Sequence, residues 1–196
     1  GPGRPPSGPR CRAGGGGLSG AAQYSISRTG ALVYVPANAQ VQRTLAWVDR
    51  QGHEEALPAE PRPYRYPRVS PDGSRVAIEA QDQDNDVWIW EFARATLTRL
   101  TFTPQNELSP LWTPDGQRVV FQTQRPRASN VYQQAANGTG AVERLTTGSN
   151  RQLPDFFTPD GKALVYSEID AKGNYDIFLQ SLDGNRASKP LLNTPF

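Results

Sequence analysis

Three aspartates recur in one short phrase of this sequence, and carboxylates of this kind can act as acids, bases or cation ligands. Asp72, Asp115 and Asp160 each stand in a Pro-Asp-Gly triplet that follows Ser or Thr, with spacings of 43 and 45 residues. Pro, Asp and Gly are also what a tight turn requires, because Pro fixes φ, Asp bonds its own backbone and Gly accepts a positive φ. The repetition therefore favours turns over chemistry at these three positions.

A second acidic group alternates like the start of a calcium loop. Asp82, Asp84 and Asp86 have the spacing of the first ligands of an EF-hand. Such a loop would need Gly at the sixth position and Glu at the twelfth, where this chain has Val87 and Ala93. The pattern favours a polar hairpin loop, with a weak surface cation site as the alternative.

Nucleophilic catalysis has little support in the sequence. The single histidine, His53, lies in a predicted exposed turn at 51–54, and residues 17–20 lack the last glycine of a nucleophile elbow. Neither a HExxH nor a CxxC pattern occurs, and Cys11 is the only cysteine. We therefore expect no catalytic residue, no metal and no cofactor. Paired-carboxylate chemistry stays open, since Glu107, Asp155 and Asp82 can meet in a fold.

Composition limits the class of protein further. The 196 residues carry a formal net charge of only +2, so we expect no nucleic-acid partner. No apolar run is long enough to span a membrane, so we expect no membrane insertion. Eighteen Gly and 18 Pro suit short strands and tight turns, and residues 1–22 are expected to form a Gly/Pro-rich linker or tail. With no methionine in the chain, Gly1 is expected to follow a cleavage site or to begin a fragment.

The elements that hold these residues repeat along the chain. A decayed fourth copy of the turn phrase, Ser27-Arg28-Thr29-Gly30, precedes the others by 43 residues. Each complete unit shows four short runs typical of strands, which we expect at 68–69, 75–79, 85–90 and 98–101, at 111–112, 118–122, 129–132 and 143–146, and at 156–157, 163–167, 175–179 and 190–193. Four-stranded antiparallel units of this period are the blades of a β-propeller. The sequence predicts an all-β fold with about four blades, approximately 23–63, 64–106, 107–150 and 151–196.

The repeat resembles the TolB-type propeller repeat, a relative of the WD repeats. The resemblance rests on the [Ser/Thr]-Pro-Asp-Gly turns, the Val/Ile/Phe strands that follow, and third strands such as Asn85-Asp86-Val87-Trp88. It covers residues 23–196. The same repeats occur in periplasmic TolB, in the propellers of prolyl-oligopeptidase-type peptidases and in sensor regions of bacterial membrane-bound serine/threonine kinases. Residues 43–52 and 64–68 look most like the last group, which implies an extracytoplasmic, periplasmic location.

The number of units departs from that family, whose propellers usually have six or more blades. Three arrangements are open. The chain is part of a larger propeller, pairs with another chain that completes the stack, or closes as a four-bladed ring. In the first two arrangements an end blade presents an apolar face, which predicts a homodimer through exposed end blades.

The loops leading into the first strand of each unit differ between repeats, as a binding surface requires, and are expected at one mouth of the central channel. They are residues 60–66, 103–109 and 148–153. The candidate ligand- or partner-binding residues in them are Tyr64, Arg65, Tyr66, Asn106, Glu107, Ser109, Asn150, Arg151 and Gln152. For Tyr64 and Tyr66 the alternative is packing between blades.

The sequence favours a non-catalytic binding module, acting as a sensor or scaffold within a larger bacterial protein. Its partner would be a protein or a small molecule at the channel mouth, where the resemblance places the lipoprotein partner of TolB. The alternative is a hydrolase or a hydrolase-associated propeller, of peptidase or glycosidase type, that uses carboxylates at the channel mouth.

Overall fold

Strands make up all the regular structure that the computed structural model describes. The described residues are 24–26, 32–34, 42–81, 84–125, 128–184 and 186–192. The predicted tail at 1–22, Cys11, the decayed turn at 27–30 and Asp82 lie outside them. In the described ranges no helix is long and apolar enough to cross a membrane.

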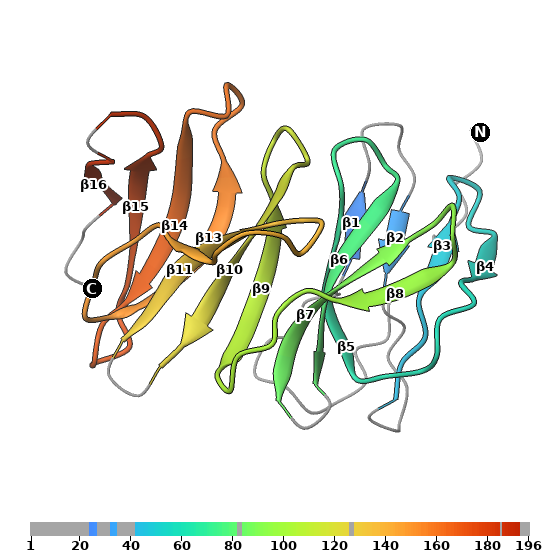
Figure 1. The fold of residues 1–196 in the computed structure, drawn as a ribbon. Coiled ribbons are helices and arrows are strands. Elements are labelled where there is room, and N and C mark those ends of the chain that lie inside the picture. Colours follow the sequence, from blue (N-terminus) through green and yellow to red (C-terminus); the bar gives the residue numbers. More distant parts are fainter. Residues whose placement is uncertain are drawn as a thin grey trace, which may run out of the picture.

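The strands form four antiparallel meanders (Figure 1). The first holds β1 (Tyr24–Ile26), β2 (Leu32–Tyr34), β3 (Ala46–Val48) and β4 (Glu54–Ala56), and the second holds β5 (Tyr64–Val69), β6 (Arg75–Gln81), β7 (Asn85–Glu91) and β8 (Thr96–Arg99). The third holds β9 (Asn106–Trp112), β10 (Arg118–Gln124), β11 (Ser129–Ala135) and β12 (Glu143–Arg144), and the fourth holds β13 (Arg151–Phe157), β14 (Ala163–Ile169), β15 (Tyr175–Ser181) and β16 (Ser188–Leu192). A single parallel bridge between Ser129 and Arg151 joins the last two meanders. We call the four units blades 1 to 4.

The blades stack through apolar joints. Val33 and Leu45 of blade 1 pack with Ile78 and Trp90 of blade 2. Equivalent clusters join blade 2 to blade 3 around Phe121, and blade 3 to blade 4 around residues such as Leu164. Because each blade is one sheet thick, these joints form the core of the molecule.

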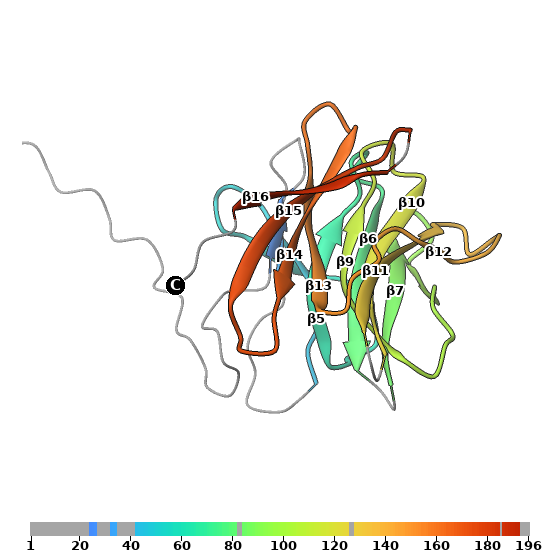
Figure 2. The ribbon, with the colours of Figure 1, turned by 90° about the vertical axis from the view of Figure 1, so that its left-hand side faces the viewer.

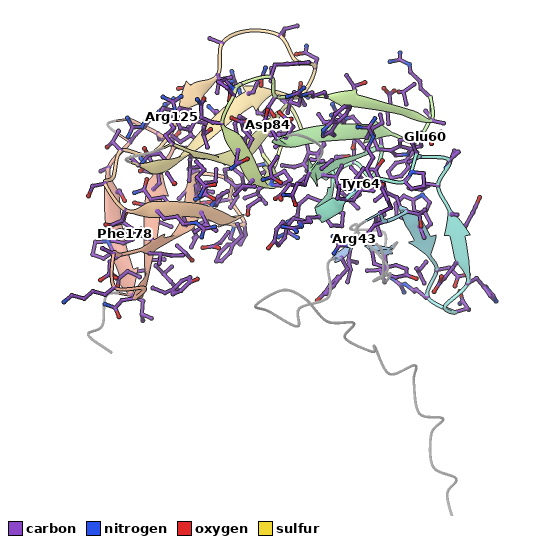
Figure 3. All side chains as sticks on the ribbon, turned by 90° about the horizontal axis from the view of Figure 1, so that it is seen from below. Arg43, Glu60, Tyr64, Asp84, Arg125 and Phe178 are labelled. Atoms are coloured by element: carbon purple, nitrogen blue, oxygen red, sulfur yellow. The ribbon has the colours of Figure 1, made fainter. Side chains whose placement is uncertain are left out.

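The first strands of the blades, β1, β5, β9 and β13, lie next to one another in that order. Seen from below in Figure 3, the blades fan into an arc that stays open on one side, with Arg43 toward the concave side and Arg125 away from it. The all-β propeller prediction is confirmed as a partial propeller, and the four-bladed closed ring is not the arrangement found.

Blade 4 ends the stack with an apolar outer surface. Figure 2 shows this blade at the front of the arc. Tyr175, Leu191 and Leu192 on it are 67%, 53% and 51% exposed. Whether another chain or a further blade covers this surface stays a prediction.

The Pro-Asp-Gly phrases form turns in the structure, as predicted. In the first of them, Asp72 Oδ1 accepts hydrogen bonds from Ser70 Oγ at 2.5 Å and from the Ser74 backbone N–H at 3.1 Å. Gly73 follows with φ of 76°, which a residue with a Cβ rarely adopts. The hydrogen bond from Ser70 does most to lower the pKa of Asp72, to about 2. The aspartate therefore organises the turn in its ionised form.

Replacing this aspartate tests the turn. Asp72→Asn is expected to lower the free energy of unfolding by about 1 kcal/mol at pH 7, since the charge-assisted bonds to Ser70 and Ser74 weaken. The pKa of Asp72 is depressed in the fold, so its contribution is present above pH ~4 and is lost as the pH falls toward 2. Urea denaturation at pH 7 and pH 2.5 measures both values, with Asp84→Asn at an exposed hairpin as the control. An equal deficit at the two pH values would contradict this account.

The first strand of each blade begins earlier than the sequence pattern indicated. The expected strands at 68–69, 111–112 and 156–157 are only the ends of β5, β9 and β13. Each longer strand contains a bulge where the pairing register shifts. Prolines at or beside the bulge hide the strand pattern, because Pro is usually excluded from a regular ladder. Much of what the sequence indicated as mouth loops is therefore strand.

Candidate functional site

Three of the candidate residues are buried in the joints between blades. Tyr64, Glu107 and Gln152 occupy equivalent positions at the start of β5, β9 and β13, and each is no more than 2% exposed. The Tyr64 hydroxyl donates to the Glu60 carbonyl at 2.7 Å. The packing alternative therefore holds for Tyr64, and none of the three side chains lies on the open surface.

Three others lie at the edge where the first strands begin. Asn106 Oδ1 accepts from the backbone N–H of Asn85 at 3.3 Å, and Asn106 Nδ2 donates to Gln124 Oε1 at 3.1 Å. Asn150 Nδ2 donates to Glu168 Oε1 at 2.9 Å, while Arg151 is exposed. Asn106 joins blade 3 to blade 2, whereas Asn150 holds the start of β13 to β14 within blade 4, which leaves Arg151 as the most accessible side chain of this edge.

The remaining three surround the bulges. Tyr66 and Ser109 occupy equivalent positions in β5 and β9 and have φ of 48° and 54°. Non-glycine residues in this region are uncommon, and for a bulky Tyr the conformation is strained. Tyr66 is 42% exposed, and Arg65 pairs in register with Glu79. The bulge thus turns an aromatic ring out of the ladder and holds it toward solvent.

Arg68 and Asp155 join Tyr66 in what we call the inner-wall cluster. Arg68 lies on β5 and Asp155 on β13, with β9 between those strands. Burial lowers the pKa of Arg68, and the negative charge of Asp155 opposes that shift. The positive charge of Arg68 in turn favours the ionised form of Asp155, so the two charges act on each other across β9. The cluster therefore places an aromatic ring, a guanidinium and a carboxylate on one surface.

Glu79 lies behind this surface and is 1% exposed. Its Oε2 accepts a long hydrogen bond of 3.4 Å from the Ser109 backbone N–H. Burial raises its pKa to about 7, since one weak bond does not replace the lost water. At the next joint, Gln122 of blade 3 is equivalent to Glu79, and Pro154 of blade 4 is equivalent to Ser109. Proline carries no N–H, and the buried amide of Gln122 has no hydrogen-bond partner in the structure.

The joint between blades 3 and 4 contains a connected polar network. Gln152 Oε1 accepts from Thr146 Oγ1 at 2.6 Å and from Asn130 Nδ2 at 2.8 Å. Its Nε2 donates to Glu168 Oε2 at 2.7 Å. Both the oxygen and the nitrogen of the Gln152 amide are therefore hydrogen-bonded, and these bonds link the two blades. The role of Gln152 is structural.

The joint between blades 2 and 3 places acids at the same positions. Asp86 corresponds to Asn130 and forms an ion pair of 2.7 Å with Arg99. Glu107 corresponds to Gln152, and one of its oxygens accepts a short hydrogen bond from the Thr103 hydroxyl. Burial raises the pKa of Glu107 to about 7, and the nearby charge of Asp86 adds to the effect. This joint thus holds a carboxyl that changes charge near neutral pH.

The carboxylates proposed for hydrolysis are engaged separately. Glu107 bonds Thr103 inside the joint, whereas Asp155 Oδ2 accepts from Ser167 Oγ at 2.7 Å. No contact joins the two carboxyls among the described residues. His53 is also apart from them, since its exposed ring pairs with Asp49 at 2.8 Å in the hairpin before β4. Within the described ranges, no three His, Cys, Asp or Glu side chains are grouped to hold a metal ion.

Sequence reasoning missed Arg68 and Glu79 as parts of this surface. The signal available was comparison between repeats. At the position of Arg68 the next two blades carry Leu111 and Phe156, and at the position of Glu79 they carry uncharged residues. A charged residue where other copies of a repeat are uncharged marks a position that the repeat itself does not explain.

Comparisons with known proteins add to this geometry. A family model described as the TolB beta propeller domain matches residues 52–194. The Tol-Pal system protein TolB of Nitratidesulfovibrio vulgaris is 34% identical over 110 residues, which are 54% of this chain and 24% of that protein. The uncharacterized peptidase YuxL of Bacillus subtilis is 25% identical over 107 residues, which are 50% of this chain and 16% of that protein. The chain thus spans about a quarter or less of these curated relatives.

A solved structure of putative TolB from Agrobacterium tumefaciens is similar in fold. It superposes with a TM-score of 0.77 at 20% identity, and the match covers 90% of this chain and 67% of that one. At this identity the likeness concerns the fold alone, and it agrees with the stacked four-stranded blades.

Proposed function

Because this chain belongs to the TolB β-propeller family, we propose that it is a non-catalytic protein-binding module that receives its partner on the concave side of the arc. The observation that carries the proposal is the inner-wall cluster, where Tyr66 is held outward at a strained bulge beside Arg68 and Asp155. Aromatic and arginine side chains are the usual anchors of protein interfaces. Strain retained in a solvent-facing aromatic is typical of functional positions.

The proposal includes the residues of the leading edge. Arg65, Ser109 and Arg151 lie around or beside the cluster on β5, β9 and β13, and would form the rim of the interface. Asn106 and Asn150 would act indirectly by holding that edge. The proposed location is extracytoplasmic, and the proposed role is that of a sensor or scaffold in a larger bacterial protein. Support comes from the TolB relative and from the resemblance of residues 43–52 and 64–68 to kinase sensor regions.

Binding peptides selected from a random phage-displayed library test the site. Tyr66→Asn and Arg68→Gln are each expected to weaken the selected peptides at least tenfold, because interface anchors contribute more than ~1.4 kcal/mol. Asn is chosen at position 66 because it tolerates the left-handed backbone. Surface plasmon resonance measures the affinities.

Tyr175→Ala is the matched control, because Tyr175 is also an exposed tyrosine but lies on blade 4. Peptides that keep their affinity for the Tyr66 and Arg68 variants and lose it for the Tyr175 variant would place the binding surface elsewhere.

A hydrolase-associated propeller is the second candidate, favoured by the likeness to the uncharacterized peptidase YuxL and by the raised pKa of Glu107. Turnover of chromogenic peptide or glycoside substrates by the purified chain, abolished by Glu107→Gln or Asp155→Asn, would favour it over the binding module.

A further inference from the structure

A pocket of about 250 Å³ opens at the joint between blades 2 and 3. The segment that follows β8 and the side chains of β10 and β11 that face blade 2 enclose it. Glu107, at the start of β9, lines the pocket. The pocket is separate from the inner-wall cluster, and its proposed use does not depend on the function proposed above.

Two buried acceptors line this pocket without a hydrogen-bond partner. One is Glu107 Oε2, and the other is Gln134 Oε1. The two residues are 0% and 8% exposed. A buried polar oxygen that stays unpaired costs about 1–3 kcal/mol, and more when it is charged. The oxygen of Glu107, which can carry a charge, therefore calls for a hydrogen-bond donor inside the pocket.

The matching joint between blades 3 and 4 has no such requirement. There Gln152 fills the position of Glu107 and bonds Thr146, Asn130 and Glu168. The unpaired carboxylate oxygen is thus a property of this one joint and not of the repeat.

The remaining walls of the pocket are aromatic or carry threonine hydroxyls. Phe102, Phe121 and Tyr132 line it. Phe102 is 73% exposed, so it stands at the mouth, whereas Phe121 is 1% exposed and lies deep. Aromatic faces attract cations as well as alkyl chains. A ligand with a short apolar stem and a cationic end fits these walls and the oxygen of Glu107.

We propose that this pocket binds a primary ammonium group on a short alkyl stem, as in a lysine side chain or a small free amine. The ammonium donates to Glu107 Oε2, and its stem lies against the aromatic walls. A guanidinium fits less well, since the other oxygen of Glu107 is held by Thr103 and no bidentate pair can form.

The charged groups near Glu107 lie on β7, on β8 and in the segment after β10. Their balance allows a cation to bind in the pocket. Asp86 on β7 and Arg99 on β8 neutralise each other at 2.7 Å. Arg125, after β10, is exposed and lies over the Tyr132 ring at 5.0 Å. Glu107 is therefore the one acid of this group without a cationic partner in contact, and Arg125 is the cation that an incoming amine must approach.

The test uses Nα-acetyl-lysine methylamide as the probe, with its Nε-acetylated form as the uncharged control. Ligand-observed NMR titration in phosphate buffer at pH 8 is expected to show saturable binding of the charged form only. At pH 6 the affinity is expected to be about tenfold lower, because the proton competes with the ammonium at a carboxyl whose pKa is about 7. Pentylamine is expected to bind if the stem and ammonium suffice, and its failure would indicate a lysine within a polypeptide.

Three variants decide the site. Glu107→Gln is expected to abolish binding and its pH dependence while the fold is kept, since Gln stands at this position in the next blade. Glu79→Gln, which removes the other buried acid of similar pKa, is the matched control and is expected to bind as the native chain does. Arg125→Gln is expected to bind at least as tightly, and loss of binding there would mean that the pocket takes an anion.

Phe102→Ala supplies a readout that does not depend on a buried residue. Its exposed ring can be removed without disturbing the core, and a several-fold loss of amine affinity is expected. Unchanged affinity in Glu107→Gln, or no binding of the charged probe to the native chain at millimolar concentration, overturns the proposal. Either result leaves the inner-wall interface untouched, because its test uses other residues.

Discussion

At pH 8 the double variant Glu79→Gln/Glu107→Gln is expected to be more stable than the native chain by several kcal/mol. Both carboxyls are buried, and their pKa values are raised from 4.5 to about 7. A raised pKa means that the folded state holds the proton more tightly than the unfolded state does. Native stability therefore falls as the pH rises from ~4.5 to ~7 and is level above that range.

The magnitude follows from the same shifts. Each pKa unit corresponds to about 1.4 kcal/mol, so each glutamate costs up to about 3 kcal/mol at pH 8. Gln removes the charge and keeps the shape, and each glutamate already has a Gln at the equivalent position of the following blade, Gln122 in blade 3 for Glu79 and Gln152 in blade 4 for Glu107. We expect a gain of about 2–5 kcal/mol for the pair, because part of the shift is offset by relaxation around the new amides.

Urea denaturation between pH 5 and pH 8 measures this gain. Buffers without amines are required, since an amine bound at Glu107 would stabilise the native chain. The double variant is expected to have a nearly level stability profile in this range. Asp84→Asn, at an exposed hairpin, is the control and should keep the native slope. A native chain whose stability does not change between pH 5 and pH 8 would refute the shifted pKa values.

Trp112→Ala is expected to cause the largest loss of stability, about 3–5 kcal/mol. The indole is 5% exposed and packs in the joint between blades 2 and 3. Its Nε1–H donates to the Arg68 carbonyl at 2.7 Å, and the Arg75 guanidinium lies 4.7 Å from the ring centroid. One residue therefore contributes core volume, a hydrogen bond and a cation–π contact between blades.

Graded replacements separate these contributions. Trp112→Phe keeps an aromatic ring and loses the hydrogen bond, so a loss of about 1–2 kcal/mol is expected. Phe102→Ala removes an aromatic that is 73% exposed and should change stability by less than about 0.5 kcal/mol. Equal losses for Trp112→Ala and Phe102→Ala in chemical denaturation would show that the joint does not carry the fold.

Repetition made much of the fold predictable. The Pro-Asp-Gly turns, the second strands and the third strands were placed correctly because turn chemistry and β-branched or aromatic runs are local signals. The first strands were predicted too short. Tyr66 and Ser109 break the strand pattern by adopting positive φ, and prolines stand at or beside each bulge.

The candidate site was predictable only in its general position. The sequence indicated residues near the start of each first strand, and the structure distributes them among joints, edge and inner wall. Tyr64 and Gln152 are buried because their strand continues into the joint, which a loop assignment could not reveal. Arg68 reaches the inner wall because β5 and β13 flank β9, a relation that depends on how blades stack.

The sequence by itself determined the blade, since each four-stranded meander follows from turns and strand runs within about 43 residues. The turn aspartates, acting as turn formers, belong to that local level. Only the tertiary structure decided what lies between blades. A Glu at position 107 and a Gln at position 152 look alike in a repeat pattern. Stacking removes both from water, and the pKa of Glu107 rises because no partner replaces that water at Oε2.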